Sequence, residues 1–282
     1  MKSNFPYLFL ITAVLMLSAA CVNRNTPKLD LVKDEFEVVT KINPHEKSVY
    51  LIFTGHHSQD DDGYFENFDG AEFVLNTLNE HDIKGSFFPT GVCFEVEKYK
   101  PVLNNIVAGG HYLSGHSFAH LFLCSYEDRN ENLVTRDSIV NDNVKLERVL
   151  QELGLTKDQY VWLVPPYEYY NQFSADAYRS LGYKLANPTS GLVTSMDWMG
   201  KDHPEYHSAA RMIQNIWDFE REHTLNGAII LIHAMDYPIR PHEDRPYRYL
   251  GEIITRLKEM GYGFKTFGDV IELENRANVS FK

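Results

Sequence analysis

Residues 227–236 read GAIILIHAMD, and no other stretch of the chain looks more like a β-strand. Its unbroken apolar run ends at His233, which predicts a buried strand with a histidine at its carboxyl end. Helical patterns flank this strand, with RMIQNIWDFEREH before it at 211–223 and RYLGEIITRLKEMG after it at 248–261. The same alternation begins with SVYLIFT at 48–54. The repeated order predicts an α/β domain with a mainly parallel sheet wrapped by helices, either a barrel or an open sheet.

Polar residues follow several of the predicted strands directly. In parallel α/β folds the carboxyl ends of the strands meet on one side and form the active site. We therefore expect one pocket to hold the following side chains: His56, His57, His116, His120, Glu168, His233 and Asp236.

Composition limits the classes of partner. The chain has 282 residues and a formal net charge of −12, which argues against binding nucleic acid or an anionic membrane surface by charge. A neutral or cationic ligand is compatible with this charge. Cys93 and Cys124 are interpreted as two buried thiols rather than a disulfide. We expect a monomer.

The amino terminus has the pattern of an export signal. Residues 1–21 read MKSNFPYLFLITAVLMLSAAC, with an apolar run too short to span a bilayer comfortably. The segment ending at Cys21 resembles a bacterial lipoprotein cleavage box, so we predict an exported protein anchored in the cell envelope by a lipid on Cys21, with plain secretion as the alternative. Residues 22–47 are predicted to be a tether with room for one short strand, and 48–275 a single domain.

The spacing of His116 and His120 raises the question of a metal site. Side chains four residues apart share a face if they form a helical turn, as in H-E-x-x-H metalloproteases, but Ser117 stands where that class has its glutamate. The spacing alone is a weak signal, and by itself it favours two unrelated surface or core histidines over a metal site. A third ligand would come from the acidic loop after the first strand, which offers Asp60, Asp61, Asp62 and Asp69, unless that loop is simply a solvated turn.

The order of five motifs is more specific than any one of them. They are IKGSFFPTG at 83–91, GHSFAH at 115–120, VPPYEYYN at 164–171, SMDW at 195–198 and IILIHAMD at 229–236. In this order they resemble the polysaccharide deacetylase family, the NodB-homology fold of the carbohydrate esterases, over nearly all of residues 48–270.

The resemblance implies a distorted (β/α)7 barrel that hydrolyses an N- or O-acetyl group from a sugar. It also implies a divalent metal, most simply Zn²⁺ with Co²⁺ or Ni²⁺ as alternatives, held by one Asp and two His. By the same resemblance, His116 and His120 would be metal ligands, His233 the general acid, and the Tyr167 N–H an oxyanion donor. The residues expected to contact the acetyl group or the sugar are Trp198, Leu231, Asp197, Glu168 and Tyr170.

The first family motif is altered here. The family has T-F-D-D-G after its first strand, whereas this chain has IFTGHH at 52–57, without either carboxylate. Similar exported proteins read FTGHEFADGG, and Asp69 aligns with their Asp, so Asp69 is the first candidate for the missing catalytic and metal-binding carboxylate. An Asp within 60–62 is the next candidate, and His56 is a candidate ligand or base. Val164 replaces the family's Arg, and Glu168 is the candidate to compensate.

The sequence therefore predicts a metal-dependent hydrolase of C–N (non-peptide) or ester bonds that deacetylates a polysaccharide or oligosaccharide. Two alternatives stay open at this stage. The altered first motif would suit a carbohydrate-binding lipoprotein without activity, and the same fold could hydrolyse a small amide.

Overall fold

The computed structural model describes residues 29–59 and 65–279. Its centre is a seven-stranded mixed sheet in the order β1-β2-β10-β3-β6-β7, with β11 beside β3. The strands are β1 Leu31–Lys33, β2 Val39–Ile42, β3 Ser48–Gly55, β6 Ser86–Pro89, β7 Tyr112–Leu113, β10 Ala228–His233 and β11 Gly263–Lys265. Strand β3 is the axis of the sheet, because β10 pairs with it in parallel along one edge, and β11 and then β6 share the other.

Two further strands, β8 (Trp162–Leu163) and β9 (Lys184–Leu185), continue the curve of the sheet as a separate parallel pair. The Tyr112 hydroxyl spans the gap between β7 and β8, since it accepts from the Trp162 N–H at 2.9 Å and donates to the Trp162 carbonyl at 3.1 Å. On the far side, an isolated bridge joins Ala186 to Val39 at the start of β2. The strands thus curl into a distorted barrel whose ring is not continuously hydrogen-bonded.

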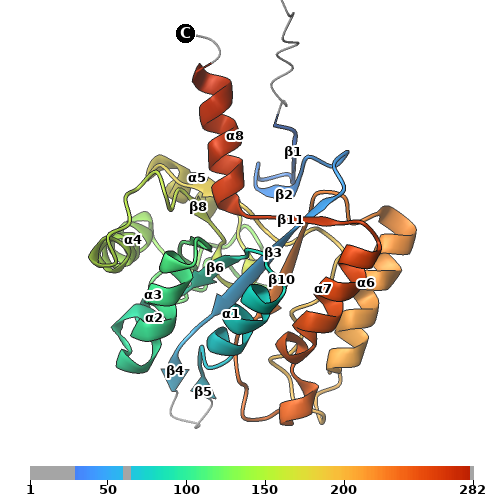
Figure 1. Cartoon of the computed structure of the whole chain (residues 1–282). Coiled ribbons are helices and arrows are strands. Elements are labelled where there is room, and N and C mark those ends of the chain that lie inside the picture. Colours follow the sequence, from blue (N-terminus) through green and yellow to red (C-terminus); the bar gives the residue numbers. More distant parts are fainter. Residues whose placement is uncertain (1–28, 60–64, 280–282) are drawn as a thin grey trace, which may run out of the picture.

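Helices surround this barrel (Figure 1). They are α1 Ala71–Glu80, α2 Gly91–Glu95, α3 Lys100–Ala108, α4 Arg136–Glu152, α5 Gln172–Ser180, α6 Ala209–His223, α7 Leu250–Glu259 and α8 Phe267–Val279. The apolar face of each amphipathic helix packs on the outside of the sheet, as the 3.6-residue period predicts.

The barrel interior has a core of its own. Aromatic side chains fill it, among them Tyr50, Phe88, Trp162 and Phe267. The Phe267 ring contacts each of the other three, with centroids 5.3 to 6.1 Å apart. Phe267 begins α8, which lies with β1 at the end of the molecule opposite the β4–β5 hairpin (Figure 1). One end of the barrel is therefore filled by α8 residues, and the other end, where β3 and β10 terminate, carries the polar residues.

The described part of the predicted tether belongs to the domain, which corrects the boundary at residue 48. Strands β1 and β2 form an antiparallel hairpin, and β2 adds to the edge of β10 with Lys41 opposite Ala228. Val38, Val39 and Ile42 are buried. So short an apolar run allows one short strand but does not predict that it is buried, and the free edge of β10 is what recruits it.

The predicted signal peptide and its Cys21 lie outside the described residues. Within residues 29–59 and 65–279, none of the helices combines the length and the apolar character needed to cross a membrane.

Candidate active site and metal centre

A cleft of about 1120 Å³ opens at the carboxyl ends of the barrel strands. Its lining includes five residues from the predicted pocket: His56, His116, His120, Glu168 and His233. The predicted convergence of strand ends is therefore confirmed for these five. The other two lie outside the lining, because the His57 ring packs edge-on against Tyr99 and the Asp236 carboxylate pairs with Arg245.

His56 follows β3 directly and is buried. Its Nδ1 lies 2.8 Å from the hydroxyl of Thr90, which follows β6, and its Nε2 lies 3.8 Å from the Glu66 carboxylate. Burial lowers the pKa of His56 to about 4, so the imidazole is neutral at neutral pH. The hydrogen bond between His56 Nδ1 and the Thr90 hydroxyl orients the ring with Nε2 toward the carboxylate, as outer residues do for metal-binding histidines.

Glu66 reaches His56 through a short hairpin that the sequence analysis missed. Strands β4 (Ser58–Gln59) and β5 (Phe65–Glu66) pair antiparallel, with Glu66 opposite Ser58, two residues after His56. The Asn67 side chain anchors the hairpin, donating to the Asp236 carbonyl at 2.6 Å and accepting from the Asp236 N–H at 2.9 Å. The Asp-Gly pair in SQDDDGYFE is a hairpin signal, and it could have placed Glu66 beside the first strand.

His116 and His120 lie in an irregular loop after β7 rather than in a helical turn. Ser117 and His120 both have positive φ, 58° and 56°. His116 Nδ1 lies 2.9 Å from the Val164 carbonyl, and because a carbonyl can only accept, Nδ1 carries the proton and Nε2 keeps its lone pair. The rings of His116 and His120 still come together, with centroids 5.1 Å apart.

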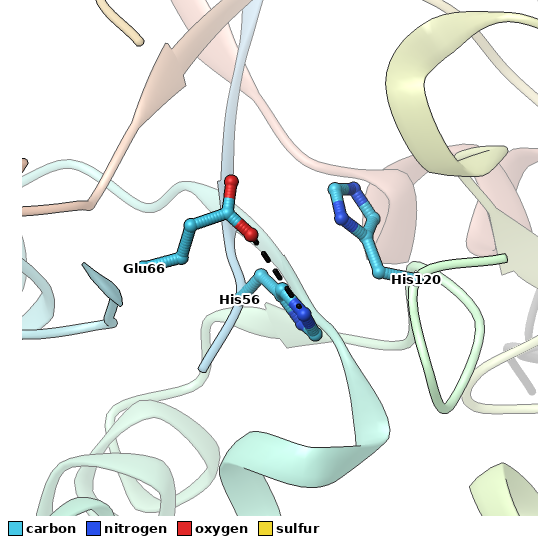
Figure 2. A group of neighbouring side chains, drawn as sticks. All are labelled: His56, Glu66 and His120. Atoms are coloured by element: carbon cyan, nitrogen blue, oxygen red, sulfur yellow. Dashed lines mark ion pairs between the residues drawn. The ribbon is translucent and has the colours of Figure 1, made fainter. Parts of the chain in front are cut away.

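His56, Glu66 and His120 form the group best arranged for a metal ion (Figure 2). One nitrogen or oxygen from each lies within 4.8 Å of the others. His120 Nδ1 is buried without a hydrogen-bond partner among the described residues, and His116 stands beside the group. Burial also lowers the pKa of His116 to about 3 and that of His120 well below its ordinary value. Neutral imidazoles with a carboxylate are a donor set that fits Zn²⁺ or a similar ion.

His233, the last residue of β10, forms a second polar pair in the cleft. Its Nδ1 lies 2.5 Å from the Asp197 carboxylate, which is 1% exposed. Burial lowers the pKa of His233, but the charge and hydrogen bond of Asp197 outweigh burial and raise it to about 9. His233 is therefore an imidazolium at neutral pH, in contrast to the neutral His56, His116 and His120.

Comparison with known proteins agrees with this geometry. The family model for polysaccharide deacetylases matches residues 41–186, slightly more than half of the chain. This chain belongs to the polysaccharide deacetylase family. Among curated relatives, peptidoglycan-N-acetylmuramic acid deacetylase PdaA of Bacillus subtilis is 26% identical over 257 residues, covering 89% of this chain and 82% of PdaA. A peptidoglycan-N-acetylglucosamine deacetylase of Bacillus cereus is 26% identical over 205 residues, covering 69% of this chain and 63% of that protein.

Solved structures share the fold of this polysaccharide deacetylase. PdaA aligns with a TM-score of 0.58 at 24% identity, over 85% of this chain and 86% of that one. Wild-type BA3943 of Bacillus anthracis, described as a CE4 family pseudoenzyme, aligns with a TM-score of 0.60 at 18% identity, over 83% of this chain and 68% of that one. The predicted fold, a distorted (β/α)7 barrel of the NodB type, is confirmed.

The structure does not bring Asp69 to the metal group of this polysaccharide deacetylase. Its side chain is 38% exposed, pairs with Lys98 at 2.7 Å and does not line the cleft. Asp69 lies between the β4–β5 hairpin and α1, and its carboxylate faces Lys98. Glu66, in β5, is the carboxylate that faces His56 in the cleft. The alternatives Asp60 to Asp62 lie outside the described residues.

The predicted sugar-contacting residues divide into two groups. Trp198 lines the cleft and is 44% exposed, and Glu168 lines it as well. Tyr167, the expected oxyanion donor, also lines the cleft and is 41% exposed. Leu231 and Tyr170 do not, and these two expectations are corrected. Leu231 shares the inward face of β10 with His233 but lies one layer deeper, in the barrel core. Tyr170 is 2% exposed, and its hydroxyl donates to Asp34 at 2.6 Å.

Asp197 does not line the cleft of the polysaccharide deacetylase either, because its carboxylate is directed at His233. Glu168, by contrast, faces the metal group. Its Oε1 lies 3.5 Å from His116 Nε2 and is buried without a hydrogen-bond partner among the described residues. Burial raises the pKa of Glu168 to about 7. Tyr167 and Glu168 both have positive φ, 59° and 51°, a strained backbone of the kind found at functional sites.

Proposed function

We propose that this chain is a divalent-metal-dependent deacetylase that removes N-acetyl groups from amino sugars of a bacterial cell-wall glycan. One observation carries the proposal: a single cleft holds a cluster of neutral histidines with a carboxylate, and also a histidinium supported by a buried aspartate. The bacterial relatives are named as peptidoglycan deacetylases, which favours an amide-linked acetyl group on peptidoglycan.

In this proposal His56, Glu66 and His120 would hold the ion, with His116 as a further ligand. A bound Zn²⁺ or similar ion supplies Lewis-acid chemistry, polarising the acetyl carbonyl and lowering the pKa of a water molecule. This assignment replaces the expected set of Asp69, His116 and His120, and it keeps both histidines of the HSFAH motif.

The remaining residues handle protons and charge. Glu168 Oε1, which has no hydrogen-bond partner among the described residues and a pKa of about 7, is suited to take the proton of the attacking water. His233 would donate a proton from Nε2 to the departing amine, since its Nδ1 is engaged by Asp197. The Tyr167 N–H is proposed as an oxyanion donor, an interaction that contributes about 3 kcal/mol when well aimed.

A second candidate function is carbohydrate binding without turnover. The observations that favour it are the absence of both family carboxylates at Thr54 and Gly55, and the resemblance in fold to a CE4 pseudoenzyme. Binding without turnover predicts that a His233→Ala variant binds acetylated glycan as the parent protein does, and that neither protein releases acetate.

The deciding experiment joins metal content to acetate release. The parent protein, His120→Ala, His116→Ala and, as a matched control, the exposed His45→Ala are purified and analysed for Zn²⁺, Co²⁺ and Ni²⁺, then incubated with N-acetylated peptidoglycan. We expect near-stoichiometric metal and acetate release in the parent and the control, and loss of both in His120→Ala. Metal-free parent protein that binds the glycan and releases nothing would establish the second function instead.

The cellular location is part of the proposal. The signal-like residues 1–21 support export, which a peptidoglycan substrate requires, and they also support a lipid anchor on Cys21. Incorporation of radioactive palmitate into the parent protein, but not into Cys21→Ala, is the expected result. Equal labelling of both would contradict the anchor and leave the deacetylase proposal unaffected.

A further inference from the structure

Exposed aromatic and apolar side chains gather at the rim of the cleft. Within the described residues, Tyr126, Tyr167, Val193 and Trp198 are large hydrophobic side chains that are both exposed and part of the cleft lining. Tyr126 is the most exposed of them, at 65%. Apolar surface that collects in one place on a protein commonly marks a ligand-binding groove.

Tyr126 is presented by a well-held loop. The loop at 123–133 closes on itself through a hydrogen bond from the Ser125 N–H to the Glu131 carbonyl at 3.1 Å. Arg129 then fastens the loop to the domain, because its Nε donates to the Tyr170 carbonyl at 2.7 Å. The exposure of the Tyr126 ring is therefore a fixed feature of the fold.

A series of ring contacts connects Tyr126 with the metal group. Tyr126 lies between Phe122 and Tyr169, each with its ring centroid 4.7 Å away. Phe122 contacts Tyr167 at 5.2 Å, and Tyr167 stacks on the ring of His120 at 4.1 Å with an angle of 15°. An aromatic surface thus runs from a candidate metal ligand out to the rim of the same cleft.

We propose that Tyr126, supported by Phe122 and Tyr169, is a subsite for a sugar ring adjacent to the ring that is deacetylated. This inference rests on the proposed function and specifies its substrate as a glycan chain rather than a single sugar.

The chemistry of the cleft favours a sugar as the occupant. A pyranose has one face of C–H groups that matches an aromatic ring, and hydroxyls at its edge that can bond with the tyrosine hydroxyl. Tyrosine supplies such a surface with little loss of side-chain entropy. No lysine or arginine is among the described residues that line the cleft, whereas Glu66, Glu168 and Glu205 are, so an anionic ligand is disfavoured.

The test compares substrates of different length. Acetate release is measured from N-acetylglucosamine and from its β-1,4-linked oligomers up to the hexamer. The proteins are the parent, Tyr126→Ala, Tyr126→Trp and Val144→Ala, since Val144 on α4 is almost as exposed, at 62%, but lies away from the cleft. We expect Tyr126→Ala to lower the ratio of kcat/KM for the hexamer to that for the single sugar by about tenfold, mainly through KM. Tyr126→Trp and Val144→Ala should keep the parent ratio.

An unchanged ratio in Tyr126→Ala would overturn the subsite. If the parent releases no acetate from any oligomer, calorimetric titration with the hexamer takes over as the readout. Weaker binding by Tyr126→Ala than by Val144→Ala would then support the subsite while the deacetylase proposal fails. Equal binding, or no binding by any of the proteins, would overturn the subsite as well.

Discussion

The Asp197 carboxylate decides the protonation state of His233. The two groups lie 2.5 Å apart, and the pKa of His233 is raised to about 9. A general acid must hold its proton in order to donate it, so activity should persist to about pH 9 and fall above it. The raised pKa of Glu168, about 7, sets the acidic limb of the pH profile. A general base must be ionised to accept a proton, so activity should decline as the pH falls below that value.

Asp197→Asn should therefore shift the alkaline limb to lower pH by at least about one unit, because the imidazolium loses its anionic partner. The measurement is kcat/KM for acetate release between about pH 5 and about pH 10, a range that covers both limbs of the bell-shaped profile. Asp202→Asn, in the same loop but exposed, is the control. An alkaline limb that stays in place in Asp197→Asn would show that His233 is not the titrating acid.

Glu66 and Asp69 are competing candidates for the carboxylate of the metal group, and they lie three residues apart. Glu66→Gln removes the charge and one good donor atom from the group with His56 and His120, so zinc affinity should fall by at least roughly tenfold. Asp69→Asn breaks an ion pair with Lys98 away from the cleft and should bind zinc as the parent does. Zinc titration against a chelating dye measures both variants. The reverse pattern would restore Asp69 as the ligand.

At the scale of secondary-structure elements, helix α4 holds the HSFAH loop in position. Asp142 on α4 is 6% exposed, and its two carboxylate oxygens accept hydrogen bonds from the N–H groups of Phe118 at 2.6 Å and Ala119 at 2.9 Å. These two residues lie between His116 and His120. The carboxylate therefore stabilises a loop whose backbone passes twice through positive φ.

Asp142→Asn should loosen this loop, because an amide offers only one acceptor oxygen to the two N–H groups. We expect a loss of about 1–3 kcal/mol in the free energy of unfolding, and zinc affinity lower by about 10- to 100-fold. Urea unfolding of the metal-free protein and zinc titration of the folded protein give the two values. The control is Glu152→Gln, because Glu152 is the exposed last residue of α4. Unchanged zinc affinity in a destabilised Asp142→Asn would limit Asp142 to a structural role.

At the scale of the whole molecule, the amino-terminal hairpin is part of the folding unit. Val38 and Ile42 are fully buried and Val39 is 3% exposed, and β2 covers the edge of β10. Full burial of such a side chain contributes about 1.5–3 kcal/mol, and a typical domain is stable by only about 5–15 kcal/mol.

A protein that begins at residue 48 should therefore fail to fold or unfold at a much lower urea concentration, whereas one that begins at residue 29 should behave as the full chain does. Soluble yield and the urea midpoint measure the difference. A cooperative transition at the same midpoint in both truncations would show that the hairpin is dispensable.

The family and the fold could be predicted from the sequence because the motif residues follow the strands directly. A residue at the end of a buried parallel strand has its position determined by the sheet, so His56, His116 and His233 could be assigned to one pocket from the strand pattern alone. The motif order then predicted the deacetylase family, and the match over residues 41–186 confirms it.

Residues that depend on contacts between distant segments could not be assigned in this way. Glu66 reaches the metal group only through the β4–β5 hairpin. Tyr170 is held away from the cleft because its own hydroxyl donates to the carboxylate of Asp34, in the supposed tether. Leu231 lies too deep because the barrel stacks its inward residues in layers.

The sequence by itself determined which elements form, which ends of the strands carry polar groups, and which family the chain joins, because these depend on local periodicity and on motif order. Only the tertiary structure decided which carboxylate faces the histidines, which histidine is protonated and which aromatic rings remain exposed. Each of these three features depends on burial and on partners brought together from separate parts of the chain. The spacing of neighbouring residues encodes neither the burial nor the partners.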